Sequence, residues 1–261
     1  MIRLLYIGDV VGQPGRRALH HRLEQVIDRE RVDFTVVNVE NAAGGFGVTE
    51  PIMHELSELP INAYTSGNHI WDKKDFVDNY DHYDHVVRPA NYPAGNPGKG
   101  WVVRQTASGV DVAVMQLMGN VFMPPCDNPF HVADRELREL AGVKVILVDI
   151  HGEATSEKQA MGRYLDGRVS AVLGTHTHVP TADERILPNG TAYQTDVGMT
   201  GAYDSVIGFR PEEVLHRFLM NTPRKLEVAK RDIRLSGAIV DIDETTGRAS
   251  RIVRLHEKAE D

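Results

Sequence analysis

Eight side chains with nitrogen or oxygen donor atoms follow five short apolar runs of the sequence. They are Asp9, Glu40, Asn41, Asn68, His69, His151, His176 and His178. The runs are continuous and bounded by glycine or polar residues, as buried β-strands are. Because ligands in open α/β sheets bind beyond the carboxyl ends of parallel strands, we expect these donors to meet at one edge. The set contains no thiol, and its imidazole, carboxylate and amide donors suit divalent first-row metals such as manganese, iron, nickel or zinc.

The donor set is larger than one tetrahedral zinc ion uses. It fits two cations about 3.5–4 Å apart, bridged by a carboxylate and by a water or hydroxide. Glu40 is the predicted bridge, since it is a carboxylate near the middle of the set. His176 and His178 lie two residues apart in a glycine-led loop and can each face a different cation. The filled site keeps a positive charge and would attract a phosphate.

Each donor also has an ordinary structural explanation. A lone histidine such as His151 is more often a structural residue than a ligand. Asp9 can cap the following helix, and Asn68 can be a turn residue in a left-handed conformation. Repetition of the pattern after five strands favours the metal site, because helix caps need neither three histidines nor a glutamate.

The elements that must position these donors are strands alternating with helices, which is typical of α/β proteins with a partly parallel sheet. Strands are predicted at residues 4–7, 34–37, 63–65, 110–114, 143–150 and 169–173, with a closing hairpin at 236–242 and 251–253. Helices are predicted at residues 15–29 and at 212–219, where Pro211 is a favourable start. The spacing of residues 156–159 is that of a capping box, which predicts another helix start.

Two proline-rich stretches, residues 88–100 and 118–130, have the composition of linkers between domains. The donors, however, run from Asp9 to His178 and straddle both stretches. Long ordered loops in a compact domain tend to form the rims of functional sites. We therefore predict a single domain over residues 1–261.

Composition restricts the class of protein. The 261 residues are 41% hydrophobic and 25% charged, which predicts a folded core. A net charge of -8 counts against broad electrostatic binding to nucleic acid or to an anionic membrane. One cysteine excludes an intramolecular disulfide, and no apolar run has the length of a signal peptide or a membrane span. We expect a cytoplasmic protein with a small-molecule substrate and no membrane partner. Nucleic acid is considered only as a substrate, and both a monomer and a homo-oligomer are compatible with the sequence.

The ordered motifs resemble those of the calcineurin-like metallophosphoesterase superfamily. The matching motifs are Gly8-Asp9, Val39-Glu40-Asn41, Gly67-Asn68-His69, Ile150-His151 and Gly174-Thr175-His176-Thr177-His178. Three features depart from the superfamily: Val11 replaces a histidine, Glu40 replaces the bridging aspartate, and one extra residue follows Gly174. The YmdB-like bacterial phosphodiesterases share these departures. Similarity to that family extends through residues 8–12, 40–45, 67–72, 88–93, 153–158 and 195–201.

This resemblance implies an α/β (α+β) fold in which two mixed β-sheets pack as a sandwich flanked by α-helices. It implies a phosphodiesterase with two divalent or trivalent metal ions, iron or manganese first, with zinc, nickel or magnesium as alternatives. It also implies 2′,3′-cyclic or RNA-derived nucleotides as substrates. The resemblance also implies the ligands of each ion. One ion would be bound by Asp9, Asn41 and His178, and the other by Asn68, His151 and His176. Glu40 would bind both ions. His69 would face the scissile phosphate without binding metal.

The predicted reaction is in-line attack by a bridging hydroxide on the phosphodiester, with His69 as the general acid that protonates the leaving oxygen. Asp72 is a candidate to orient His69 or to cap the segment after Trp71. Lys158 and Arg88 are candidates for contacts with phosphate.

Two questions stay open at the level of sequence. Asp196 either lines the site or anchors the loop that ends at Gly201. The chain is alternatively a phosphomonoesterase such as a nucleotidase, or a metal-stabilised regulatory or RNA-binding protein with little turnover. Motifs of serine hydrolases and P-loop kinases are absent from the sequence, which leaves those classes without support.

Overall fold

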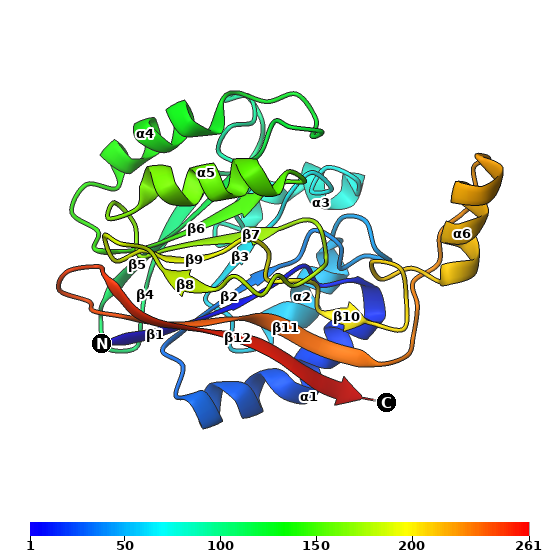
Figure 1. Cartoon of the computed structure of the whole chain (residues 1–261), viewed down its shortest axis with the longest axis horizontal. Coiled ribbons are helices and arrows are strands. Elements are labelled where there is room, and N and C mark those ends of the chain that lie inside the picture. Colours follow the sequence, from blue (N-terminus) through cyan, green and yellow to red (C-terminus); the bar gives the residue numbers. More distant parts are fainter. Residues whose placement is uncertain (261) are drawn as a thin grey trace.

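In a computed structural model that describes residues 1–260, two six-stranded β-sheets pack together, with helices covering their outer faces (Figure 1). The helices of these residues are α1 Gly12–Glu30, α2 Glu50–Ser57, α3 Lys74–Asp78, α4 Pro129–Glu139, α5 Thr155–Leu165 and α6 Pro211–Met220, with a short 3-10 helix at Tyr80–His82. The fold class expected from the resemblance, a sandwich of two mixed sheets with flanking helices, is confirmed.

The first sheet has the strand order β10-β11-β1-β2-β3, and β12 pairs with β11. Its strands are β1 Ile2–Ile7, β2 Phe34–Asn38, β3 Ala63–Thr65, β10 Gly201–Ala202, β11 Ile233–Ile242 and β12 Ala249–Glu260. Strands β1, β2 and β3 run parallel, with Leu4 opposite Phe34 and Val36 opposite Ala63. Strand β11 is antiparallel to β1 and forms the predicted hairpin with β12.

The second sheet has the order β4-β5-β6-β7-β9-β8. Its strands are β4 Trp101–Gln105, β5 Asp111–Met118, β6 Val145–His151, β7 Ala171–Thr175, β8 Arg185–Ile186 and β9 Ala192–Gln194. Strands β5, β6, β7 and β9 are parallel, and the two edge strands are antiparallel to their neighbours. Both sheets therefore present several parallel carboxyl ends.

Alternate residues of β1 face different layers of the core. Leu4 and Tyr6 belong to the cluster that fills the space between the sheets together with residues of β5, β6 and β7. Leu5 and Ile7 pack with residues of α1 and α2 on the outer face. Helices α4 and α5 cover the outer face of the second sheet in the same way. Because both faces are buried, these strands are continuous apolar runs without the alternation of a half-exposed strand.

The start of α5 differs from the predicted capping box. The helix begins at Thr155, and no side chain caps its N-terminus. The carboxylate of Glu157 instead accepts hydrogen bonds from the backbone N–H groups of Asn120 and Val121, at 2.8 and 3.2 Å. Glu157 thus ties the second proline-rich stretch to α5.

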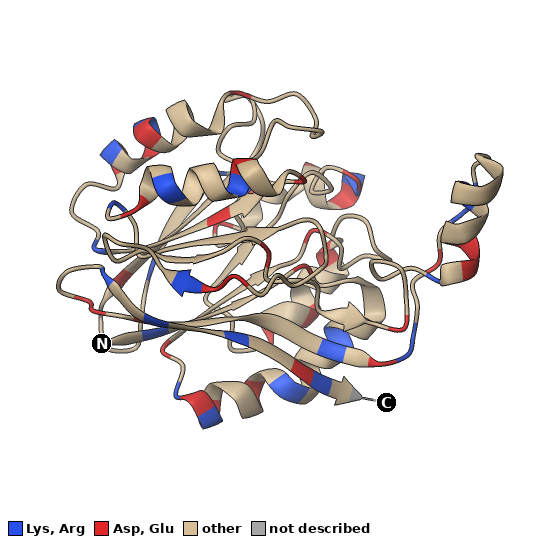
Figure 2. Cartoon of the chain, in the orientation of Figure 1, with Lys and Arg blue, Asp and Glu red and all other residues tan. Residues whose placement is uncertain are grey.

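Charged residues are spread over the outer elements. Figure 2 shows basic and acidic residues interspersed along α1, α4 and α5. Within residues 1–260, no helix has both the length and the apolar character needed to cross a bilayer. Helix α6 stands away from the two sheets (Figure 1).

Candidate metal centre

The eight predicted donors lie at carboxyl ends of parallel strands, but those strands belong to two sheets. The donors after β1, β2 and β3 of the first sheet are Asp9, Glu40, Asn41, Asn68 and His69; those at the end of β6 and after β7 of the second sheet are His151, His176 and His178. The single edge expected from the sequence is therefore built from both layers of the sandwich.

Glu40, His151 and His176 form the centre of this group. Nε2 of His151 is 3.1 Å from Oε1 of Glu40 and 3.2 Å from Nδ1 of His176. Oδ1 of Asn68 is 2.9 Å from the same Nε2. One candidate ligand atom from each of Glu40, His151 and His176 lies within 4.8 Å of the others. A cation at this point would meet carboxylate, imidazole and amide donors together.

Two buried oxygen atoms beside this cluster have no hydrogen-bond partner among the described residues, Oδ1 of Asp9 and Oδ1 of Asn41. The other carboxylate oxygen of Asp9 accepts from the backbone N–H of His176 at 3.0 Å. The amide nitrogen of Asn41 donates to the carbonyl of Gly45 at 2.9 Å, which leaves Oδ1 as the free end of the side chain. A buried oxygen without a partner is costly, and a divalent cation satisfies it. The residues present therefore fit the metal that the donor pattern predicts.

A chain of buried hydrogen bonds orients His151. Its Nδ1 lies 2.9 Å from Oγ1 of Thr175, and that hydroxyl donates to Oδ1 of Asp149 at 2.7 Å. The hydroxyl oxygen is then the acceptor for Nδ1–H of His151, so Nε2 is the nitrogen directed at Glu40. Metal-ligating histidines are commonly held in this way by a partner on their other nitrogen. Thr175 and Asp149 were not predicted as site residues, although a carboxylate inside the apolar strand at 143–150 is a usable signal.

His176 and His178 are likewise oriented by polar partners that lie outside the donor cluster. Nδ1 of His178 donates to the carbonyl of Ile207 at 2.8 Å. Nε2 of His176 is 3.3 Å from the carboxylate of Glu153, while its Nδ1 faces His151. Each imidazole therefore has one nitrogen engaged outside the cluster and the other available to it.

The loop that carries His176 and His178 is held in an unusual backbone conformation. Both residues have positive φ, 94° and 65°, which costs energy for a residue other than glycine. Oδ2 of Asp196 accepts from the backbone N–H and the hydroxyl of Thr177, at 3.1 and 2.7 Å, and from Nζ of Lys158 at 2.8 Å. Lys158 and Asp196 are fully buried, so they anchor this loop. The suggested contact of Lys158 with phosphate is wrong because its ammonium group is already committed to this buried pair.

Arg88 has no phosphate-binding role at this site either. It is buried, and its guanidinium donates to the carbonyl oxygens of Pro97 and Pro89, at 3.1 and 2.9 Å. It lines a different hollow, beside Tyr92 and Trp101. Its hydrogen bonds order the first proline-rich stretch.

His69 differs from the three clustered histidines. Its Nδ1 is 2.8 Å from Oδ2 of Asp72, and its backbone N–H donates to Oε2 of Glu40 at 2.9 Å. The ring packs edge-to-face against Phe46, with centroids 5.0 Å apart. Of the two roles considered for Asp72, the structure shows the one in which it orients His69. Nε2 of His69 is then the nitrogen available to a ligand.

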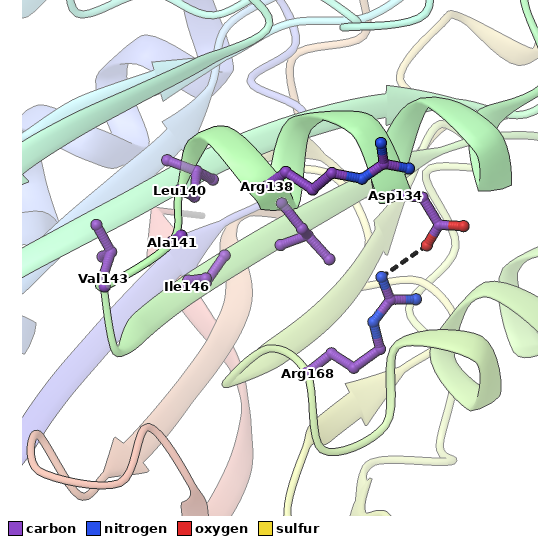
Figure 3. Close-up of a pocket in the computed structure, with 9 residues that line it drawn as sticks. Asp134, Arg138, Leu140, Ala141, Val143, Ile146 and Arg168 are labelled. Carbon is purple, nitrogen blue, oxygen red and sulfur yellow. Dashed lines mark hydrogen bonds and ion pairs between the residues drawn. The ribbon is translucent and has the colours of Figure 1, made fainter.

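A cavity of about 490 Å³ opens onto the cluster and is bordered there by Glu40, Asn41, His69, His176 and His178. A second cavity, of about 390 Å³, lies beside the end of α4 (Figure 3). Arg168 donates to Asp134 there at 2.6 Å, and Leu140, Val143 and Ile146 give the cavity an apolar lining. Only the first of these two cavities combines a hollow with metal-ligating side chains, so we take it as the candidate site.

A model of the YmdB-like protein family matches residues 5–255. The chain belongs to the YmdB-like family. It is 49% identical over 255 residues to a 2′,3′-cyclic-nucleotide 2′-phosphodiesterase of Bacillus subtilis strain 168, and the match covers 97% of this chain and 96% of the relative.

Two solved structures are similar over nearly their whole length. A hypothetical protein from Thermus thermophilus has a TM-score of 0.92 and 43% identity, covering 98% of this chain and 99% of that one. A novel phosphatase from Mycoplasma pneumoniae has a TM-score of 0.91 and 33% identity, covering 98% and 94%. The resemblance found in the motifs is thus confirmed for the chain as a whole.

The position that departs most from the wider superfamily has a local explanation in this YmdB-like protein. Val11 is buried, and its N–H donates to the carbonyl of Thr200 at 2.9 Å. The next N–H, of Gly12, donates to the carbonyl of Asn41 at 2.9 Å, so Asn41 lies beside the segment that lacks the histidine. Asn41 thus brings a buried oxygen, Oδ1, that has no hydrogen-bond partner among the described residues close to this segment.

Electrostatic coupling within the YmdB-like site is strong because Asp9, Glu40 and His151 are buried side by side. Desolvation acts to lower the pKa of His151, but the charge of Glu40 and its hydrogen bond outweigh it and raise that pKa to about 9. Burial acts to raise the pKa of Glu40, but the charge of His151 holds it below its usual value. Burial raises the pKa of Asp9 to about 6, against the opposing charges of His178 and His151. Burial, followed by the charge of His151, lowers the pKa of His176 to about 3.

Cation binding is expected to release a proton and to weaken as the pH falls. Below about pH 9, His151 carries a proton on the nitrogen that a cation needs, so affinity should fall by up to about tenfold per pH unit. Below about pH 6, Asp9 also takes up a proton, which steepens the loss. Calorimetric titration with Mn²⁺ at several pH values, in two buffers of different ionisation enthalpy, measures both effects. An affinity that does not vary between pH 6 and pH 8 would contradict this expectation.

Gly67 is expected to be essential for cation binding although it offers no ligand atom. A Cβ atom at this position would overlap Oε2 of Glu40 and Nε2 of His151. We expect Gly67→Ala to displace these donors and lower the metal content measured by elemental analysis. Gly95→Ala is the matched control, because a Cβ there meets no atom within 4 Å and the variant should keep its metal.

Proposed function

We propose that the chain is a metal-dependent phosphodiesterase that hydrolyses 2′,3′-cyclic nucleoside monophosphates. The observation that carries this proposal is that two buried oxygens, on Asp9 and Asn41, have no hydrogen-bond partner among the described residues and lie beside the cluster of Glu40, His151 and His176 at the end of a cavity. The 49% identical relative from Bacillus subtilis, named for this activity, supports the substrate class.

Two cations fit the number and arrangement of donors. The proposed ligands of one are Asp9, Asn41 and His178, those of the other are Asn68, His151 and His176, and Glu40 is shared between them. Iron or manganese is proposed for both positions, with zinc, nickel or magnesium as alternatives. When bound, the cations supply positive charge for the phosphoryl oxygens and an activated water.

The chain's own contribution to bond breaking is assigned to His69. Asp72 accepts the hydrogen bond from Nδ1–H and holds the ring, which leaves Nε2–H to donate. Water adds to phosphorus and gives up a proton to solvent. The bond to one ribose oxygen breaks, Nε2–H protonates that oxygen as it leaves, and His69 regains a proton from solvent. A positioned proton donor of this kind contributes roughly 10²–10⁴-fold to the rate.

The proposal is tested with purified protein loaded with Mn²⁺ and, separately, with Fe²⁺. Hydrolysis of 2′,3′-cyclic AMP and bis-p-nitrophenyl phosphate is compared with hydrolysis of adenosine 3′-monophosphate at equal metal content. We expect the two diesters to be cleaved and the monoester to be a poor substrate. Elemental analysis of protein purified without added metal identifies the native ion.

One observation favours a second candidate, a phosphomonoesterase. The relative of known structure from Mycoplasma pneumoniae, 33% identical, is named a phosphatase. Preferential release of phosphate from the monoester would select this candidate. Full metal loading with no turnover of any of the three esters would instead select the regulatory or RNA-binding alternative.

A further inference from the structure

The cavity has an aromatic wall that begins at His69. The ring of Phe46 packs edge-to-face on His69 and is stacked with Phe209, with centroids 5.2 Å apart and planes inclined by 21°. Both phenylalanines line the cavity that opens onto the cluster. A flat aromatic surface therefore starts next to the group that would face the scissile phosphate.

This wall is held rigidly. Phe209 is only 4% exposed, and its backbone exchanges hydrogen bonds with Val206 at 2.9 and 3.0 Å. Gly45 has a φ of 97°, and a Cβ atom there would lie 2.7 Å from the ring of Phe209. Gly45 therefore lets the loop approach that ring closely. The rings need no rearrangement to receive a planar ligand, which lowers the entropic cost of binding.

Helix α6 supplies another part of the cavity lining. Its residues Val214, Arg217 and Phe218 line the cavity, and Phe218 is 81% exposed. Figure 1 shows α6 held away from the sheets. Nε of Arg217 donates to the carbonyl of Arg224 at 2.8 Å and so ties the helix to the segment that returns to the fold. A large exposed aromatic side chain at the rim of a polar site suggests a ligand with an aromatic part.

We propose that Phe46 and Phe218 form the nucleobase subsite for the substrate, with the buried ring of Phe209 stacked on Phe46 as its support. The inference rests on the proposed function, since it takes the phosphate end of the ligand to be at the metal cluster. The base stacks against the aromatic wall while the cyclic phosphate reaches His69 and the donor cluster. Stacking uses the π-face that all bases share, and the three rings offer no hydrogen bond to a base edge. The subsite therefore requires a base without selecting strongly among the four.

The test compares 2′,3′-cyclic AMP with ribose 2′,3′-cyclic phosphate, which lacks a base, on the Mn²⁺-loaded protein. The base-free ester should have a KM at least about tenfold higher, in line with the usual strength of base stacking. Phe218→Ala should raise the KM for 2′,3′-cyclic AMP about tenfold, with little change in kcat, and should leave the base-free ester unaffected. Leu219→Ala is the matched control, because Leu219 is equally exposed on α6 but is not part of the cavity lining, and it should change neither value. The KM values of the four 2′,3′-cyclic nucleotides should agree within about tenfold.

Calorimetry with adenosine 3′-monophosphate and ribose 3-phosphate separates this inference from the proposed function. If the wild type hydrolyses neither cyclic ester, the proposed function fails. The subsite is still supported if adenosine 3′-monophosphate binds more tightly than ribose 3-phosphate and if Phe218→Ala abolishes that difference in affinity. The inference of a nucleobase subsite is overturned if the wild type has equal KM values for 2′,3′-cyclic AMP and the base-free cyclic ester. It is also overturned if Phe218→Ala changes the two KM values equally. Sedimentation of both α6 variants completes the test. A different result is that Phe218→Ala and Leu219→Ala both dissociate a larger assembly and change KM equally. That result would assign the exposed face of α6 to contact between copies of the chain and overturn the role of Phe218.

Discussion

Replacing His69 with alanine is expected to lower kcat for a diester by roughly 10²–10⁴-fold and to leave the metal content unchanged. The side chain borders the cavity, and its ring is held by Asp72 and Phe46 outside the cluster of Glu40, His151 and His176. Its removal therefore takes away a proton donor without taking away a ligand. Steady-state kinetics and elemental analysis on the same preparation measure the two quantities.

Two further variants sharpen the result for His69. Asp72→Asn should give a smaller loss of kcat, because it keeps the imidazole but weakens its orientation. His20→Ala removes a histidine paired with a carboxylate, Glu55, at 3.1 Å on the surface of α1, and should leave kcat unchanged. Loss of the bound cations in His69→Ala would show that His69 is a ligand and would contradict its role as the general acid.

Replacing Lys158 with methionine is expected to reduce the free energy of unfolding by about 3–5 kcal/mol and to weaken cation binding. The substitution leaves the buried carboxylate of Asp196 without its opposite charge, although Thr177 still donates to it. The loop with positive φ at His176 and His178 then loses part of its support. Urea unfolding and Mn²⁺ titration measure the two effects.

The design separates the buried pair from a general effect of charge removal on α5. Arg163→Met removes an exposed cation from the same helix and should change the free energy of unfolding by no more than about 0.5 kcal/mol. Asp196→Asn combined with Lys158→Met should recover part of the lost stability, since no buried charge is left alone. A Lys158→Met protein with wild-type stability and wild-type affinity for Mn²⁺ would show that the pair does not support the loop.

The strands that carry the donors could be predicted because the signal for each is local. An apolar run such as 63–65 or 169–173 is followed within two residues by glycine and then by polar donors, and this pattern occupies a few residues. Helix α4 was not predicted, since it begins at the end of the proline-rich stretch 118–130. Its start nevertheless has a recognisable cap: Oδ1 of Asn128 accepts from the N–H groups of Phe130 and His131, and Pro129 follows. The shorter α2 and α3 carry too few apolar positions to establish a helical period.

The partition of the strands into two sheets could not be predicted in this way. Strand β1, near the start of the chain, lies between β2 and β11, and Ile2 pairs with Ile242. No short-range pattern specifies such a pairing, because it depends on which distant apolar faces pack together. The same limit applies to Lys158, whose partner Asp196 is 38 residues away. A lysine in a polar stretch has the composition of a surface residue, and only packing removes it from solvent.

By itself, the sequence determined the family and predicted the kind of chemistry and the eight donors, since each depends on residue types at short, ordered spacings. The tertiary structure alone decided that the donors come from two sheets, that Asp9 and Asn41 each keep an unpaired oxygen, and that Lys158 supports a loop instead of meeting a phosphate. The physical reason is range. Strand and turn preferences act between neighbouring residues, whereas burial, hydrogen-bond pairing and charge coupling are set by residues that meet only once the chain has folded.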